Sequence, residues 1–425
     1  MTELDIKQDI EDFKHYSCLT YGPTVAPPTC KITDTDIENI TKFLCRIITN
    51  CRDTNITLND LSKGKILNRG SFGYTYKVGN DKNIIIKIIV CTKETIQTDI
   101  IKEIELLETL TTFNKDNYIN LYGYFKRIQN TYEFTKISVP TPLKIDCIDK
   151  SYTFGDSCEM YLLMEEGNYD LTKFKSPISL INIIKFIDLL NFYKLSKKII
   201  KMNKGIFIHS DIKLENIILS KDDKFKLIDF GLSQFSNTFF SQNANGTPYF
   251  FNLLFTYQNK FDYRLCVTSP LYDIFCLLLS YFELCLQKRL TLPTYTVDEI
   301  NKRMNLFINL NKDIEKYIEG LLIIFNSIYN YHQEILKKYY EELDKSGGYF
   351  MRFTSYFVGR EKAYINLYNL RDFTLINIES SKKSLIPIYE DTGNKLFDEI
   401  KYVERLINFA LPSHILEDDS GIISI

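Results

Sequence analysis

The sequence lacks any apolar run that could cross a bilayer. The apolar stretches near Ile199 and at residues 274–286 contain Lys or Glu and are too short to span one. The first residues carry acids and have no apolar core, so we expect no signal peptide. No lipidation motif or run of like charge indicates a membrane anchor. These absences favour a cytoplasmic protein, with the nucleus left open.

An excess of one charge and a metal-binding cysteine pattern are also missing. The 52 basic and 54 acidic residues leave a formal net charge of -2, so the protein as a whole lacks the excess of basic residues that is typical of nucleic-acid-binding proteins. The ten cysteines form no C-x-x-C pair and no cluster with zinc spacing, so we expect reduced thiols. Tryptophan is absent, but hydrophobic (45%) and charged (25%) fractions are those of globular proteins, which excludes a disordered, collagen-like or coiled-coil chain.

The order of the expected elements predicts an α+β protein with two lobes and a cleft between them. Residues 1–62 are expected to form an extension with one amphipathic helix, which would begin at the capping box of Thr35 and Glu38. Strand-like runs at 65–67, 74–78, 84–89, 121–127 and 160–164 surround a helical run at 99–110, and beyond Leu180 the chain is mostly helical. The predicted domain occupies 63–345, with a small β-rich lobe at 63–164, a larger helical lobe at 168–345 and a polar insertion loop at about 128–158. Residues 346–425 are expected to form a helical extension with a flexible tail.

A glycine-rich turn and a lysine suggest a phosphate site in the strand-rich part. Asn68, Gly70 and Gly73 lie in a turn between two strand-like runs, where backbone N–H groups could approach a phosphate. Taken alone, such a turn is more often a plain hairpin. A Rossmann loop would need a following helix and a Walker loop a Gly-Lys-Ser/Thr sequence, and neither is present. Lys87 lies inside an apolar run, so it either faces outward or meets a phosphate and a carboxylate.

The helical run after Lys87 offers three candidate carboxylates for it. Glu103 shares an apolar face with leucines of the same run, whereas Glu105 and Glu108 remain alternatives.

The most informative segment reads His-Ser-Asp-Ile-Lys-Leu-Glu-Asn at 209–216 and is followed by Asp-Phe-Gly at 229–231. Phosphoryl transfer from a nucleotide requires positioning, charge neutralisation and Mg²⁺, which prefers hard oxygen ligands. Asn216 and Asp229 can supply such oxygens. Asp211 can orient a hydroxyl, and Lys213 can neutralise a transferred phosphoryl group. Each residue alone is more often a solvated loop residue, but the ordered set is rarely accidental.

This segment resembles the H-R-D-x-K-x-x-N and D-F-G motifs of the eukaryotic-type protein kinase superfamily, and the resemblance covers about residues 63–290. It implies ATP and Mg²⁺ as cofactors. The implied catalytic residues are Asp211, Lys213, Lys87 and Glu103, and the implied metal ligands are Asn216 and Asp229. Nucleotide contacts are implied for Asn68, Gly70, Gly73, Thr75, Ile85, Lys87, Met164, Glu165, Gly167 and Ile218. Met164 would be the gatekeeper, and the backbone of residues 165–167 would meet the adenine.

The sequence departs from the superfamily at several positions. Asn68, Thr75 and Ile85 replace a glycine, a valine and an alanine around the nucleotide. Ser210 replaces the arginine that pairs with a phosphorylated activation segment, so we expect activity that does not depend on such phosphorylation. Residues 252–254 lack the glutamate that braces the substrate platform, and no arginine, Arg289 included, is identified as its partner from the sequence.

The same motifs indicate the substrate class. Lys213 and the Gly-Thr-Pro sequence at 246–248 resemble those of Ser/Thr kinases, so the expected partners are proteins with Ser or Thr acceptors. Glu215 stands where some kinases of the superfamily bind an arginine of the substrate, although a glutamate also occurs at this position in kinases that do not bind one. The oligomeric state stays open.

Two alternatives remain beside the active kinase. One is a pseudokinase scaffold of the same fold, which the altered loop, Ile85 and Ser210 motivate. The other is a small-molecule kinase of related fold, which Lys213 and the Gly-Thr-Pro sequence disfavour. The abundance of Ile, Asn and Lys suggests an origin in a large DNA virus or an AT-rich unicellular organism. A viral protein would act in the host cytoplasm.

Overall fold

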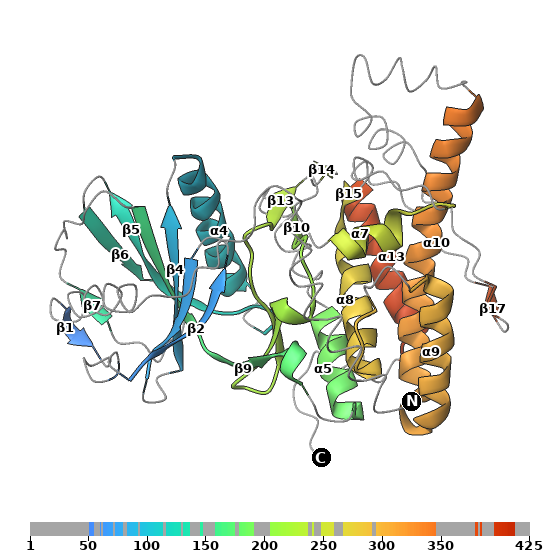
Figure 1. The fold of residues 1–425 in the computed structure, drawn as a ribbon, viewed down its shortest axis with the longest axis horizontal. Coiled ribbons are helices and arrows are strands. Elements are labelled where there is room, and N and C mark those ends of the chain that lie inside the picture. Colours follow the sequence, from blue (N-terminus) through green and yellow to red (C-terminus); the bar gives the residue numbers. More distant parts are fainter. Residues whose placement is uncertain are drawn as a thin grey trace, which may run out of the picture. The chain divides into compact units, whose positions relative to one another are not determined.

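The computed structural model divides the chain into two compact units (Figure 1). The first comprises Met1–Cys91, Gly123–Lys136 and Pro140–Leu163, and the second Thr92–Tyr122, Ile137–Val139 and Met164–Ile425. The structure describes residues 51–54, 60, 63–70, 73–79, 83–91, 94–113, 116–128, 131–136, 145–147, 158–174, 178–190, 205–236, 240–241, 248–258, 267–290, 295–345, 379–380, 383–384 and 395–412. The predicted helix behind Thr35 and the tail beyond residue 412 lie outside these residues.

A six-stranded sheet forms most of the first unit. Its order is β2 (Lys65–Gly70), β3 (Gly73–Lys77), β4 (Ile84–Cys91), β8 (Cys158–Glu165), β5 (Leu121–Ile128) and β6 (Thr131–Lys136). Strand β4 confirms the strand-like run predicted at 84–89. Its side chains alternate in burial, because Ile84, Ile86 and Ile88 are buried while Ile85 and Lys87 are partly exposed. A separate pair joins β1 (Cys51–Thr54) to β7 (Ile145–Cys147).

The prediction of a plain loop at about 128–158 is wrong in part. Strand β6 extends the sheet by pairing antiparallel with β5, and β7 pairs with β1 from the predicted N-terminal extension. Residues 131–136 read Thr-Tyr-Glu-Phe-Thr-Lys, in which aromatic and polar residues alternate as in an edge strand. The partner strand supplies hydrogen bonds that a composition-based prediction of a loop does not consider.

The second unit is largely helical, as expected. Its helices are α4 (Glu94–Phe113), α5 (Leu180–Leu190), α7 (Pro248–Phe255), α8 (Pro270–Leu286), α9 (Val297–Leu310), α10 (Glu315–Lys345) and α13 (Lys395–Ala410). Single 3₁₀ turns are η1 (Leu171–Lys173), η3 (Leu214–Asn216) and η5 (Lys312–Ile314). The α+β prediction is therefore confirmed by a sheet-forming unit followed by a helical one.

Short strands interrupt the region that the sequence predicts to be mostly helical. Strand β11 (Ile217–Ser220) lies between β9 (Gly167–Asp170) and β12 (Phe225–Leu227), and β10 (Ile206–Ile208) pairs with β13 (Gln234–Ser236). Minor pairs join β14 (Phe240–Ser241) to β15 (Val267–Thr268) and β16 (Glu379–Ser380) to β17 (Lys383–Ser384). The strands β9 to β13 position the candidate site.

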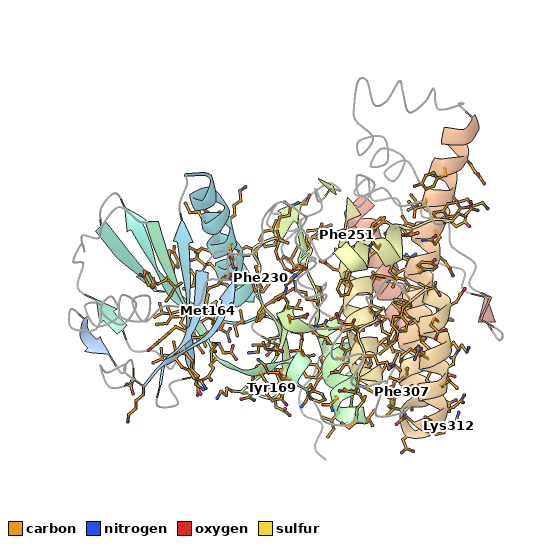
Figure 2. The ribbon with its side chains drawn as sticks, in the orientation of Figure 1. Met164, Tyr169, Phe230, Phe251, Phe307 and Lys312 are labelled. Atoms are coloured by element: carbon orange, nitrogen blue, oxygen red, sulfur yellow. The ribbon has the colours of Figure 1, made fainter. Side chains whose placement is uncertain are left out.

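Helix α8 is the centre of the helical unit, and every residue from Pro270 to Cys285 is buried. Ser269 caps its N-terminus by accepting a hydrogen bond from Tyr272 N at 3.3 Å. A helix that is apolar all round requires neighbours on every side, and helices α5, α9, α10 and α13 pack against it (Figure 1). Phe251 of α7, which Figure 2 labels, stacks on Tyr272 with ring centroids 4.7 Å apart.

Helix α13, in the predicted C-terminal extension, packs within this unit. Its Glu399 is fully buried and accepts a hydrogen bond from Leu271 N at the start of α8, at 3.3 Å. Gly320 of α10 meets the end of α13 so closely that a Cβ atom would lie 2.3 Å from Ala410 O. The domain boundary at 345 stays a prediction. Among the described residues, no helix has the length and apolar character that a membrane span requires.

Candidate active site

The segment between β10 and β11 brings three predicted site residues together. Lys213 Nζ lies 2.8 Å from Asp211 Oδ2. Asn216 Nδ2 donates to the same Oδ2 at 3.0 Å and to the Asp211 carbonyl oxygen at 2.8 Å. Two donors therefore hold the Asp211 carboxylate in one orientation.

Strand pairing places Asp229 next to this segment along the backbone. Ile217 pairs with Leu227, and Ile228 N donates to Asn216 O at 3.0 Å. Asp229 follows at φ 64°, a left-handed conformation that few residues other than Gly, Asn and Asp tolerate. Its side chain is exposed, whereas the next residue, Phe230, is buried.

The available oxygens suit Mg²⁺. Both amide hydrogens of Asn216 point to Asp211, and its Oδ1 accepts no hydrogen bond from the described residues. One carboxylate and one amide oxygen, completed by phosphate oxygens and water, form a set that Mg²⁺ prefers. The residues present thus fit the metal that the sequence implies.

Asp273 of α8 anchors the backbone just before Asp211. Its Oδ2 accepts from His209 N at 2.6 Å and its Oδ1 from Ser210 N at 2.9 Å. Ser210 has φ 72°, so the turn needs such an anchor. Complete burial raises the pKa of Asp273 to about 7, although the two N–H donors oppose the shift.

The His209 ring links the Asp211 and Asp229 segments. Its Nδ1 accepts from Asp211 N at 3.3 Å and its Nε2 faces Ile228 O at 3.1 Å, which assigns the proton to Nε2. Burial lowers the pKa of His209, although the charges of Asp211 and Asp229 oppose the shift, so the ring stays neutral. Its ring centroid lies 5.2 Å from that of Phe230, whose position Figure 2 shows.

Met164, Glu165, Gly167 and Ile218 also lie in the second unit. Gly167 contacts Ile218 so closely that a Cβ atom would lie 2.5 Å from Ile218 Cδ1. Met164 and Ile218 are each 7% exposed. Glu165 N donates to Asn120 O at 2.9 Å, and the Glu165 side chain is buried, so a nucleotide contact of this residue would use its carbonyl group.

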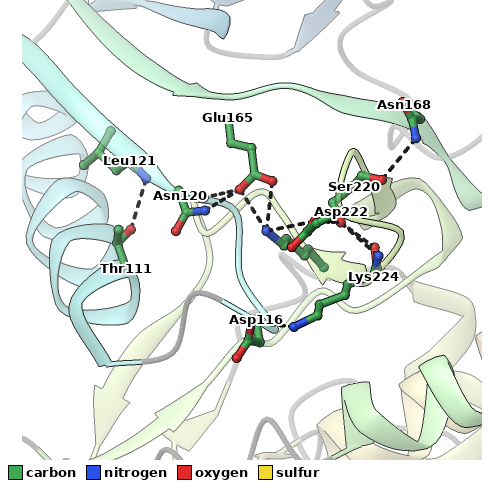
Figure 3. A network of polar contacts seen from close by, with 10 residues as sticks. Thr111, Asp116, Asn120, Leu121, Glu165, Asn168, Ser220, Asp222 and Lys224 are labelled. Carbon is green, nitrogen blue, oxygen red and sulfur yellow. Dashed lines mark hydrogen bonds and ion pairs between the residues drawn. The ribbon is translucent and has the colours of Figure 1, made fainter. Parts of the chain in front are cut away.

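The buried Glu165 side chain belongs to a polar network that the sequence did not predict (Figure 3). Lys226 Nζ lies 2.8 and 2.9 Å from its two carboxylate oxygens, and Asn120 Nδ2 donates to Oε2 at 2.5 Å. Lys226 stands on β12, three residues before Asp229. The network therefore joins residue 165 to the strand that leads to the candidate metal ligand.

The remaining predicted nucleotide contacts lie on three neighbouring strands of the first unit. Thr75 pairs with Lys87 on one side and with Asn68 on the other, and Gly70 pairs with Gly73. Ile85 and Lys87 stand on the same side of β4, two residues apart. Residues 71–72 between the glycines, and Gly246 and Thr247, lie outside the described part of the chain.

Glu103 is the most buried of the three candidate glutamates. It is 7% exposed on α4, whereas Glu105 is exposed and Glu108 is partly exposed. Its pairing with Lys87 stays a prediction. Glu215, which the sequence left as a possible reader of substrate arginine, instead contacts Arg289.

Adding a methyl group at Gly167 is expected to weaken nucleotide binding. In Gly167→Ala the new Cβ would push Ile218 out of place, so we expect a roughly threefold to tenfold rise in the Kd for ATP, which is the cost of about 1 kcal/mol of overpacking. Fluorescence titration with a labelled nucleotide measures it. The double variant with Ile218→Val should recover part of the affinity, and an unchanged Kd in Gly167→Ala would contradict the prediction.

Comparison with known proteins assigns a family to this arrangement. Residues 61–252 match the model of the protein kinase domain. The chain is 30% identical to an Aurora kinase of Saccharomyces cerevisiae over 184 residues, which cover 42% of this chain and 41% of that protein. It is 26% identical to a probable serine/threonine-protein kinase of Dictyostelium discoideum over 273 residues, 57% of this chain and 52% of that one. The chain thus spans about half the length of these relatives or less.

Proposed function

Because the chain belongs to the eukaryotic-type protein kinase superfamily, we propose that it is an ATP- and Mg²⁺-dependent serine/threonine protein kinase. Such an enzyme transfers the γ-phosphoryl group of ATP to a Ser or Thr hydroxyl of another protein. The observation that carries the proposal is the contact of Lys213 and Asn216 with the Asp211 carboxylate, since this geometry suits phosphoryl transfer.

Each residue of the candidate site would have a distinct role. Asp211 would accept a hydrogen bond from the acceptor hydroxyl and orient it, while Lys213 would neutralise charge on the phosphoryl group. Asn216 and Asp229 would hold Mg²⁺, which neutralises phosphate charge when bound. Lys87 would bind the α- and β-phosphates, with Glu103 as its proposed partner.

Activity measurements on three proteins test the proposal. Wild type is expected to phosphorylate a generic protein on Ser and Thr, whereas Asp229→Asn should lose at least about a hundredfold in rate, because a metal ligand is lost. Lys87→Met should also lose activity through weaker phosphate contacts. An equal, background-level signal from all three proteins would contradict the proposed kinase activity and favour a pseudokinase scaffold.

Asp223→Asn is the matched control for Asp229→Asn. Asp223 is also an exposed aspartate at positive φ (62°), on the other end of β12. It pairs with Lys185 at 2.5 Å rather than with a site residue. Its replacement should leave the rate near that of wild type, which separates a metal ligand from general damage to this hairpin.

A further inference from the structure

A guanidinium group lies between two carboxylates beside the catalytic segment. Arg289, just after α8, contacts Glu215 Oε1 through Nη2, and its Nη1 lies 3.4 Å from both Glu215 Oε2 and Glu283 Oε2. The second carboxylate also accepts a hydrogen bond from Leu290 N at 2.8 Å. One cation thus bridges two acids that come from different elements.

The two carboxylates differ in exposure. The side chain of Glu283 on α8 is 1% exposed, whereas that of Glu215 is 41% exposed. Two acids this close repel each other unless a cation lies between them, and a buried carboxylate needs a partner. Burial alone would lower the pKa of Arg289, but the charges of Glu283 and Glu215 outweigh this effect and raise the pKa above its usual value. The guanidinium therefore stays charged.

The position of Glu215 connects this site with the chemistry. It lies in η3 directly before Asn216 and two residues after Lys213, whose amine contacts Asp211. Its exposed carboxylate is therefore part of the segment that an acceptor peptide must approach. A forked guanidinium matches paired carboxylate oxygens better than an ammonium group does.

We propose that Glu215 and Glu283 form a guanidinium site that the chain fills with its own Arg289, so that acceptor selection does not use an arginine of the substrate. The proposal deepens and rests on the proposed kinase function. Arg289 is then a specificity-determining residue, and its removal opens the site to an arginine supplied from outside.

Peptide selectivity tests this directly. Peptides that carry one arginine at each position flanking an acceptor serine are compared with matched glutamine peptides. Wild type should show equal kcat/KM within each pair. Arg289→Ala should prefer one arginine peptide by at least about tenfold, the value of a charge-assisted contact. A wild-type preference for arginine, or no preference in the variant, would overturn the proposal.

Binding of a small guanidinium gives a readout that does not depend on activity. Ethylguanidinium, well below denaturing concentrations, should raise the melting temperature of Arg289→Ala and reduce its preference for the arginine peptide. Ethylammonium has the same charge without the fork and should do neither. If wild type is no more active than Asp229→Asn, the proposed kinase function is wrong, but the thermal shift of Arg289→Ala with ethylguanidinium still tests the guanidinium site. If that thermal shift is absent, the guanidinium site itself is refuted.

Further variants guard against misfolding. Arg289→Ala removes the guanidinium that pairs with the buried Glu283 carboxylate. The double variant Arg289→Ala with Glu283→Gln therefore avoids an uncompensated charge at position 283. It should still bind ethylguanidinium through Glu215. Arg289→Ala with Glu215→Gln should lose the arginine preference. The matched control is Arg303→Ala, which breaks a 2.9 Å pair with Glu299 on α9 and should create no preference.

Discussion

Replacing Lys226 with methionine is expected to lower the free energy of unfolding by about 3–5 kcal/mol, the usual cost of leaving one buried charge of an ion pair uncompensated. Lys226 is 2% exposed, and its ammonium contacts both oxygens of the Glu165 carboxylate. Asn120 donates to the same carboxylate but carries no charge. The change would therefore strand an anion inside the protein.

Urea unfolding at neutral pH measures this loss, and a second change tests its cause. Lys226→Met with Glu165→Gln should recover most of the stability, because the glutamine oxygen still accepts from Asn120 and the remaining partner of Lys226, Asp222, has a side chain that is 49% exposed. Lys224→Met is the control, since Lys224 and Asp116 form a pair with side chains 49% and 57% exposed. It should cost less than about 1 kcal/mol. Equal losses in Lys226→Met and Lys224→Met would refute the role assigned to the buried pair.

Replacing Asp273 with asparagine is expected to lower both the free energy of unfolding and the kcat of the proposed kinase reaction. The carboxylate accepts from two backbone N–H groups, whereas an asparagine offers one oxygen and turns an amide donor toward the other N–H. One buried donor left unsatisfied costs about 1–3 kcal/mol. The turn at Ser210 would then relax from its left-handed conformation and displace Asp211.

Steady-state kinetics separate this effect from simple instability. At a temperature where Asp273→Asn is fully folded, kcat should fall at least about tenfold while the KM for ATP changes little, because misplacement of a catalytic group affects the transition state most. Asp298→Asn, in the first turn of α9, is the control for loss of a helix N-terminal charge. A wild-type kcat in Asp273→Asn would contradict the anchoring role.

Residues close in sequence account for what could be predicted. Asp211, Lys213 and Asn216 lie within five residues of one another, so local spacing alone indicated that they act together. The apolar run at 84–89 likewise predicted β4, but it left open on which side of the strand Lys87 stands, and only the burial of Ile84, Ile86 and Ile88 in the structure decided this. The strand β6 was missed because an edge strand depends on its partner, β5, rather than on its own hydrophobicity.

The sequence by itself determined which side chains the proposed phosphoryl transfer would use, because that chemistry demands particular side chains at short, ordered spacing. Only the tertiary structure decided which charges pair across long separations. Lys226 and Glu165 are 61 residues apart, Arg289 and Glu215 are 74 apart, and Asp273 lies 64 residues from His209. A charged residue has no preference among distant partners until burial removes water and leaves one partner within reach, and this selection depends on how the helices and strands pack.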